Sequence, residues 1–307
     1  MQVRDKLADA WVMEILEPIS KFLEQNDVTD ILISSSENAL IERAGNLNKV
    51  HNPFTSEQEV RAWAISVLKL AGSRIDIAKP LAEVSFTSQF GLVRFHAVLG
   101  GECSDFTQIS IRRHLANHSS LDELEQRGFL TQIQAQWLRK MLLDKENFVI
   151  VGGTGSGKTT LLRALMNECS TERVITIEDS PELQLAGNAV PLKTRAANNE
   201  GFGEIAINQL LRASLRMRPD RLVIGEARGE ELLLLLQALN TGHSGAGFTL
   251  HANSAGEAIP RMMAILASCG LSPKLATVLI EAAVHWIIAV QRSDSQRLVI
   301  SIDRVAK

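Results

Sequence analysis

A glycine-rich stretch between an apolar segment and a helical pattern carries the clearest chemical signal in this sequence. It spells G-x-x-x-x-G-K-T over residues 152–159, directly after four apolar residues. A strand, a glycine-rich turn and a helix start in that order form a phosphate-binding loop, because the backbone N–H groups and the helix dipole both favour an anion. The alternative, a structural glycine turn, rarely shows this eight-residue pattern between a strand and a helix. The residues expected to bind the phosphates are Gly153, Thr154, Gly155, Ser156, Gly157, Lys158, Thr159 and Thr160.

Within this loop, Lys158 and Thr159 have distinct expected roles. Lys158 should reach the β- and γ-phosphates of a nucleoside triphosphate. The hydroxyl group of Thr159 should bind Mg²⁺, a cation that prefers oxygen ligands.

Carboxylates follow two later apolar segments. Three of them lie within residues 178–182, and Glu226 ends a second segment in which Gly225 stands where aspartate is common. Open α/β sheets bind ligands at the carboxyl ends of their strands. We therefore expect Glu182 to hold hydrated Mg²⁺ or polarise water, and Glu226 to orient an attacking water molecule. The alternatives are a solvated loop at Glu182 and a buried strand that ends in a surface glutamate at Glu226.

Two histidines border another apolar segment. His243 lies in a glycine-bracketed turn, and His251 follows the segment itself. A lone histidine is usually structural. The pattern leaves a nucleotide-sensing role and a turn-packing role open for His243, and favours a functional role less for His251.

Composition and charge narrow the class of protein. The chain has 307 residues, room for about two domains, and 45% of them are hydrophobic. A net charge of −3 without a basic run disfavours direct binding to nucleic acid. The three cysteines lack the spacing of a zinc site or a disulfide framework. No segment has the length and apolarity of a membrane span, so membrane association is expected through partners or a surface helix.

The first part of the chain has the pattern of a small α+β domain. An apolar stripe at helical spacing over about residues 5–25 predicts a helix that Pro18 breaks, and Ser56 with Glu59 forms the capping box of another helix. Strand signals predict a sheet, and they cover residues 28–34, 39–43, 47–50, 81–86, 92–99 and 107–112.

A polar segment at residues 116–120 is the best linker, and it places a domain boundary near residue 118. Beyond it, wholly apolar strand segments alternate with helical ones. Such strands belong in a sheet that is covered on both faces, which predicts a three-layer RecA-like α/β domain. The strand segments are 148–151, 174–177, 221–224 and 247–251.

Together the motifs resemble, in order, the Walker A, Asp box, atypical Walker B and His box of the type II/type IV secretion ATPases. The matching segments are 152–160, 176–183, 222–226, 241–243 and 250–253. The resemblance covers about residues 28–302. It implies an α/β fold with a RecA-like P-loop ATPase domain over residues 119–307, preceded by a smaller α+β domain with a PAS-like sheet over residues 1–118. It also implies ATP and Mg²⁺ as ligands.

Within this superfamily the sequence resembles the Tad-pilus branch, of the CpaF/TadA type, most. Segments 193–204 and 215–221 carry that likeness. The VirB-type branch of conjugative systems shares the second segment and residues 111–113, and is the runner-up. The four-cysteine zinc motif of the type II secretion and pilus-extension branches is missing, which argues against both.

The resemblance also implies that Arg94 and Arg112 act as arginine fingers from the N-terminal domain. A loose phosphoryl-transfer transition state spreads negative charge that a fixed guanidinium group can stabilise. The alternative is a strand-surface arginine paired with a neighbouring acid. The connection between the two arginines departs from the family, because residues 99–104 replace a proline-rich step.

The expected protein is therefore a homo-hexameric ATPase on the cytoplasmic side of the bacterial inner membrane. It would work with inner-membrane platform proteins to drive a pilus or secretion machine, with catalytic residues Glu226, Glu182, Arg94, Arg112 and His243 and metal ligands Thr159 and Glu182.

Three other classes of protein are alternatives. A small-molecule kinase would need an acceptor-binding lid. A nucleic-acid motor would show salt-sensitive binding, and an inactive scaffold would fit the loss of Lys158 or Glu226, both of which are present.

Overall fold

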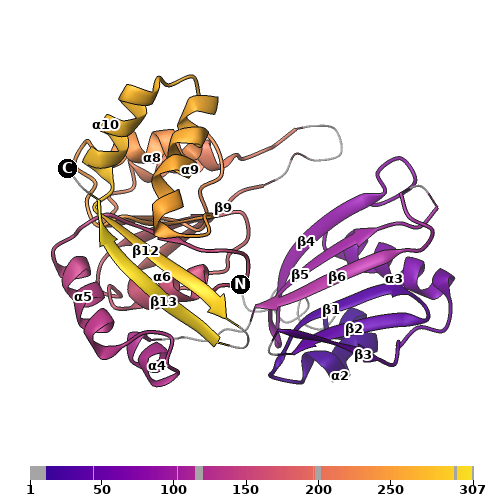
Figure 1. Ribbon diagram of the computed structural model, residues 1–307. Coiled ribbons are helices and arrows are strands. Elements are labelled where there is room, and N and C mark those ends of the chain that lie inside the picture. The colour runs from indigo at the N-terminus through magenta and orange to yellow at the C-terminus, as the bar shows by residue number, and fades with distance from the viewer. Residues whose placement is uncertain are drawn as a thin grey trace. The chain divides into compact units, whose positions relative to one another are not determined.

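The computed structural model describes residues 12–43, 45–101, 103–114, 120–195, 197, 202–293 and 296–305 (Figure 1). The chain divides into two compact units, which we call the N-terminal unit (Met1–Asn117) and the C-terminal unit (His118–Lys307). The predicted linker, residues 116–120, lies outside the described residues except for Ser120. No helix among the described residues is long and apolar enough to cross a membrane.

The N-terminal unit is a six-stranded sheet with helices packed on one face (Figure 1). The strand order is β3-β2-β1-β6-β5-β4, and every pairing is antiparallel. The elements are η1 (Glu17–Ile19), α2 (Ser20–Leu23), β1 (Val28–Ser35), β2 (Asn38–Arg43), β3 (Asn46–Val50), α3 (Glu57–Leu70), β4 (Leu81–Ser88), β5 (Gly91–Val98) and β6 (Gln108–His114).

Local sequence signals account for the ends of these helices. Ser56 accepts a hydrogen bond from the backbone N–H of Glu59 and caps α3, as its capping box predicts. Pro18 lies in the 3-10 turn η1 that follows helical residues 12–16, where the sequence predicts a break. The apolar face of α3 packs through Trp63 against Phe95 of β5, so that the opposite face of the sheet is left to polar side chains.

The C-terminal unit is a seven-stranded sheet between two layers of helices (Figure 1). The order is β13-β12-β7-β11-β10-β8-β9, and only the β12–β13 pairing is antiparallel. Its elements are α4 (Leu121–Gln126), α5 (Gln132–Leu143), β7 (Phe148–Val151), α6 (Lys158–Asn167), β8 (Val174–Glu178), β9 (Ala189–Lys193), α7 (Ile207–Ser214), β10 (Arg221–Ile224), α8 (Glu231–Leu239), β11 (Gly247–Leu250), α9 (Ala255–Ser268), α10 (Pro273–Ala283), β12 (Trp286–Ser293) and β13 (Gln296–Arg304).

The central strands are buried on both faces because successive side chains point to opposite sides of the sheet. In β7, Val149 and Val151 belong to the core formed with α7 to α10. Phe148 and Ile150 belong to the core formed with α4 to α6. The predicted three-layer α/β domain is confirmed, and the sequence reasoning did not predict β9 or the β12–β13 hairpin.

Candidate nucleotide-binding site

The predicted phosphate loop lies between the carboxyl end of β7 and the start of α6. Gly155 and Gly157 have φ angles of 71° and 99°, which L side chains rarely adopt. A β-carbon on Gly157 would lie 2.7 Å from the ring of Phe129, and one on Gly152 would lie 2.3 Å from the carbonyl oxygen of Val290. Backbone angles and close neighbours therefore both require glycine in this loop.

Lys158, the first residue of α6, is held over the loop. Its Nζ atom donates hydrogen bonds to the carbonyl oxygens of Gly152 at 2.8 Å and Gly153 at 2.9 Å. Only 7% of Lys158 is exposed, and this burial lowers the pKa of its ammonium group. The charge of Glu226 acts against this lowering of the pKa, and the charge of Arg228 adds to it.

A row of polar side chains continues from Lys158 across the ends of β11 and β10. The Lys158 Nζ atom lies 3.4 Å from Nδ1 of His251, and Nε2 of His251 lies 3.0 Å from Oε1 of Glu226 without the alignment of a hydrogen bond. Arg228 donates to Oε2 of Glu226 at 2.5 Å. Parallel pairing of β7, β11 and β10 produces this row, because their carboxyl ends meet at one edge of the sheet.

The electrostatics of the row assign different charge states to its members. Burial alone would raise the pKa of Glu226, but the hydrogen bond from Arg228 and the charges of Arg228, His251 and Lys158 outweigh it and lower that pKa. Burial and the nearby Lys158 lower the pKa of His251. At neutral pH, Glu226 is therefore an anion and His251 is an uncharged imidazole.

Glu178 at the end of β8 has a different environment from Glu226. It is 5% exposed, and burial raises the pKa of its carboxyl group to about 8. Its Oε1 atom accepts hydrogen bonds from the backbone N–H groups of Glu182 at 3.1 Å and Leu183 at 3.0 Å. Glu178 therefore holds the turn that follows β8.

Glu178 also explains the glycine in the Walker B-like segment. A β-carbon on Gly225 would lie 2.9 Å from Cγ of Glu178, so any side chain at residue 225 would collide with this buried glutamate. Residue 225, where aspartate is common, is a glycine here because the carboxyl group of Glu178 on the neighbouring strand occupies the space beside it. The sequence places Glu178 among three carboxylates, of which Glu182 was predicted to be the functional one. The feature of the sequence that could have pointed to Glu178 is Gly225, which follows the strand that pairs with β8.

Glu182 lies in the turn after β8, and its backbone is tied to α6. Its carbonyl oxygen accepts a hydrogen bond from Arg163, an 8% exposed residue of α6 whose pKa is lowered by burial. Nearby, Asp179 accepts a hydrogen bond from the hydroxyl group of Thr194 at 3.0 Å. The described residues contain no group of three or more His, Cys, Asp or Glu side chains that could hold a metal ion.

The oxygen-bearing side chains at the carboxyl ends of these strands still fit Mg²⁺, because this ion takes one or two oxygen ligands from a protein and the others from phosphate and water. Thr159 follows Lys158 in the first turn of α6 and offers a hydroxyl group, and Glu182 offers a carboxylate in the turn after β8.

His243 lies away from the phosphate loop of its own chain, and its catalytic role stays a prediction. It precedes β11, where its Nδ1 atom lies 3.2 Å from the carbonyl oxygen of Ala238, and it lines a depression with Arg221 at the amino end of β10. The phosphate loop lies at the opposite edge of the sheet. Within one chain His251, which the sequence reasoning ranked lower, is the histidine that contacts the site.

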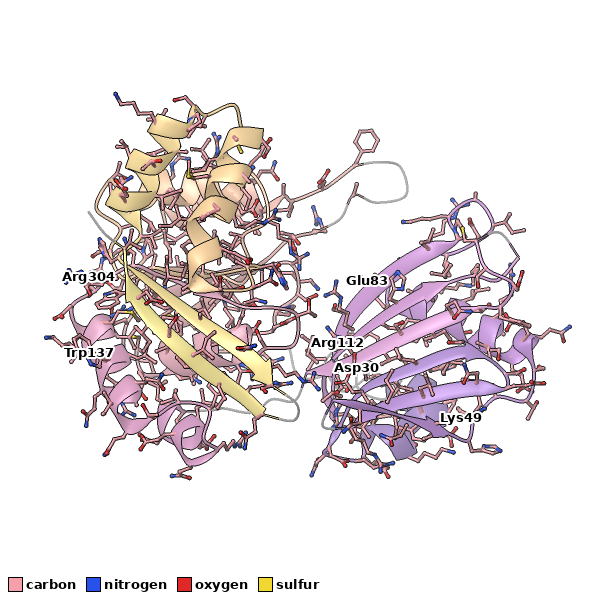
Figure 2. All side chains as sticks on the ribbon, viewed as in Figure 1. Asp30, Lys49, Glu83, Arg112, Trp137 and Arg304 are labelled. Carbon is pink, nitrogen blue, oxygen red and sulfur yellow. The ribbon has the colours of Figure 1, made fainter. Side chains whose placement is uncertain are left out.

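Arg94 and Arg112 lie on the polar face of the N-terminal sheet. They are direct cross-strand partners on β5 and β6. Arg112 Nε lies 2.9 Å from Asp30 of β1, and Arg94 Nε lies 2.6 Å from Glu83 of β4; the side chains of Asp30, Glu83 and Arg112 are labelled in Figure 2. The structure brings the two arginines beside each other and pairs each with an acid.

The phosphate loop at the edge of a three-layer α/β sheet, with a lysine and an ionised glutamate beside it, defines a P-loop nucleotide-binding protein. A family model described as "Type II/IV secretion system protein" matches residues 96–304. The chain belongs to this family.

Individual relatives agree with the family. The chain is 37% identical to a putative conjugal transfer protein of Mycobacterium tuberculosis over 289 residues, which cover 92% of this chain and 81% of that one. It is 32% identical to the conjugal transfer protein TrbB of Rhizobium radiobacter, covering 90% and 83%. The solved structure of the Legionella pneumophila ATPase DotB has a TM-score of 0.66 at 20% identity, covering 97% of this chain and 82% of that one. The DotB likeness supports the fold alone.

Proposed function

We propose that this protein hydrolyses ATP at the phosphate loop of the C-terminal unit. The row from Lys158 through His251 to Glu226 is the observation that carries the proposal. Phosphoryl transfer needs little covalent chemistry from the protein, so positioning and charge stabilisation dominate. Bound Mg²⁺ supplies further charge neutralisation on the β- and γ-phosphates.

Each residue of the row then has a role that follows from its charge. Lys158 neutralises phosphate charge in the bound nucleotide. Glu226, held as an anion, orients a water molecule and accepts its proton as it attacks the γ-phosphate. The uncharged His251 lies between them, and its ring, 3.0 Å from the carboxylate of Glu226, restricts where that carboxylate can move. Thr159 and Glu182 would hold Mg²⁺, whereas Glu178, protonated at neutral pH, is a poor base and keeps the turn after β8 in place.

Arg94 and Arg112 are proposed to stabilise the transition state as arginine fingers of the N-terminal unit. Their side chains are 37% and 49% exposed, and their acidic partners hold them on the sheet surface. Exposed ion pairs contribute little free energy, so exchanging Asp30 or Glu83 for a phosphate group costs little.

The machine that ATP hydrolysis drives is proposed to be a conjugative or other type IV secretion system. Two relatives at 37% and 32% identity are described as conjugal transfer proteins, and these support the VirB-type alternative better than the Tad-pilus assignment. We further propose a homo-hexamer at the cytoplasmic face of a bacterial inner membrane, with membrane proteins of that machine as partners.

The decisive experiment compares ATP binding and ATP turnover in the parent, Lys158→Ala and Glu226→Gln. Lys158→Ala should lose turnover and bind ATP more weakly, because it removes charge that stabilises the ground state. Glu226→Gln should bind ATP like the parent and lose turnover, because the carboxylate acts when water attacks. Equal loss of ATP affinity in both variants would contradict these roles.

A test in the host bacterium addresses the machine. A strain that carries Glu226→Gln should lose conjugative transfer of DNA while it still makes the protein. Normal transfer together with loss of surface pili would favour the Tad assignment instead.

A further inference from the structure

The C-terminal hairpin β12–β13 borders the phosphate loop. Strand β12 pairs with β7 in parallel, up to Ala289 opposite Val151, and then continues to Ser293 in the hairpin with β13, drawn in yellow in Figure 1. The approach is close, because a β-carbon on Gly152 would lie 2.3 Å from the carbonyl oxygen of Val290. The end of β12 therefore lies beside the phosphate loop.

Two arginines of the hairpin reach this loop. Arg292 on β12 and Arg297 on β13 are cross-strand partners. A β-carbon on Gly155 would lie 3.5 Å from Nη1 of Arg292, and one on Gly157 would lie 3.3 Å from Cδ of Arg297. Arg292 is half-buried and Arg297 is exposed. Both guanidinium groups therefore lie within reach of a ligand bound at the phosphate loop.

The strand order fixes which end of a nucleotide would face the hairpin. In the order β12-β7-β11-β10, His251 and Glu226 follow β11 and β10 on one side of the loop, and Arg292 lies on the other side. Attack on the γ-phosphate is in line, so the leaving nucleotide points away from the attacking water. Because Glu226 marks the position of that water in the proposed function, the leaving nucleotide, with its ribose and base, is expected on the β12 side of the γ-phosphate.

We infer that Arg292, with Arg297 beside it, contacts the nucleoside end of the bound nucleotide. A planar guanidinium group can stack on a base and donate hydrogen bonds to the ribose. This contact would allow the chain to select a nucleotide over bare polyphosphate, which a phosphate loop alone cannot do. The inference rests on the proposed function, since it uses the direction of attack assigned to Glu226.

Calorimetric binding of three ligands in the presence of Mg²⁺ tests this inference. The ligands are ATP, ADP and inorganic tripolyphosphate, and the proteins are the full chain, Arg292→Ala and Arg297→Ala. We expect Arg292→Ala to bind ATP and ADP about tenfold more weakly, the loss of one charge-assisted hydrogen bond. Its affinity for tripolyphosphate should equal that of the parent. Arg297→Ala should show the same pattern with a smaller loss, because its side chain is more exposed.

The matched control is Arg304→Ala. Arg304 lies on the same hairpin at its other end, opposite Trp286, and its guanidinium carbon is 5.6 Å from the Trp286 ring centre (Figure 2). Removing it changes net charge equally but should leave all three affinities unchanged. Thermal unfolding checks each variant, and Arg292→Lys, which keeps the charge without the planar group, replaces Arg292→Ala if that variant does not fold.

The outcomes separate the two proposals. The first case is that the parent binds ATP and Lys158→Ala does not. In that case, an Arg292→Ala variant that binds ATP like the parent, or loses equal affinity for ATP and tripolyphosphate, would overturn the nucleoside contact alone. A parent chain that fails to bind ATP would overturn the proposed function and this inference with it.

Discussion

At the scale of single residues, His243 and His251 differ in which end of a strand they occupy, and this decides which of them lies beside the phosphate loop. Both border the strand β11, and the sequence favours His243 because of its glycine-bracketed turn. A strand has two ends, however, and only its carboxyl end meets the phosphate loop in a parallel sheet. His251 lies at that end, 3.0 Å from Glu226.

We predict that His251→Ala and His243→Ala differ in ATP turnover. His251→Ala should reduce turnover on the order of 100-fold, because a misplaced catalytic group can cost that much. Its affinity for ATP should change less than its turnover, since His251 acts through Glu226. His243→Ala, the matched control, should keep turnover close to that of the parent in a steady-state assay. A similar loss in both variants would show that the position along β11 does not matter.

At the scale of secondary-structure elements, β8 and β10 approach each other through Glu178 and Gly225. The buried carboxyl group fills the space that a side chain on Gly225 would need. Burial favours the protonated form of Glu178, so the stability of the folded chain depends on the protonation of this carboxyl group.

We predict that Glu178→Gln becomes more stable relative to the parent as pH rises. The pKa of Glu178 is about 8 in the folded chain against an ordinary value of 4.5. Between these values the folded state keeps a proton that the unfolded state has lost, so the free energy of unfolding falls as pH rises through this window. The glutamine variant has no such proton, and its stability relative to the parent should rise from pH 5 to pH 8.

Urea unfolding of both proteins at pH 5 and pH 8 measures this difference, and groups that titrate in both proteins cancel in the comparison. A constant difference between the two pH values would mean that Glu178 titrates normally.

At the scale of the whole molecule, the proposed catalysis couples the two units. Lys158 and Glu226 belong to the C-terminal unit, whereas Arg94 and Arg112 belong to the N-terminal unit. If nucleotide holds the units together, hydrolysis can release them as rigid bodies.

We predict that Arg112→Ala and Arg94→Ala are folded, hexameric and nearly inactive. Loss of an arginine finger costs on the order of 10³ in rate. The fold should survive, because both arginines form exposed ion pairs that contribute little to stability. Turnover and analytical ultracentrifugation measure the two properties.

Lys49→Ala is the control for these variants, since Lys49 is an exposed cation on β3 of the same sheet (Figure 2). Turnover within about threefold of the parent in both arginine variants, far short of the loss of an arginine finger, would mean that the N-terminal unit does not stabilise the transition state.

The sequence by itself determined the phosphate loop, the family and the three-layer sheet. Local chemistry encodes these features: glycine is needed where φ is positive, serine caps a helix, and strands buried on both faces are apolar throughout. The tertiary structure alone decided which polar side chains meet. Glu178 and Gly225 are 47 residues apart in the sequence, and their contact depends on β8 pairing with β10. Likewise, Arg292 reaches the phosphate loop only because β12 pairs with β7, and strand order depends on long-range packing that no local pattern of residues records.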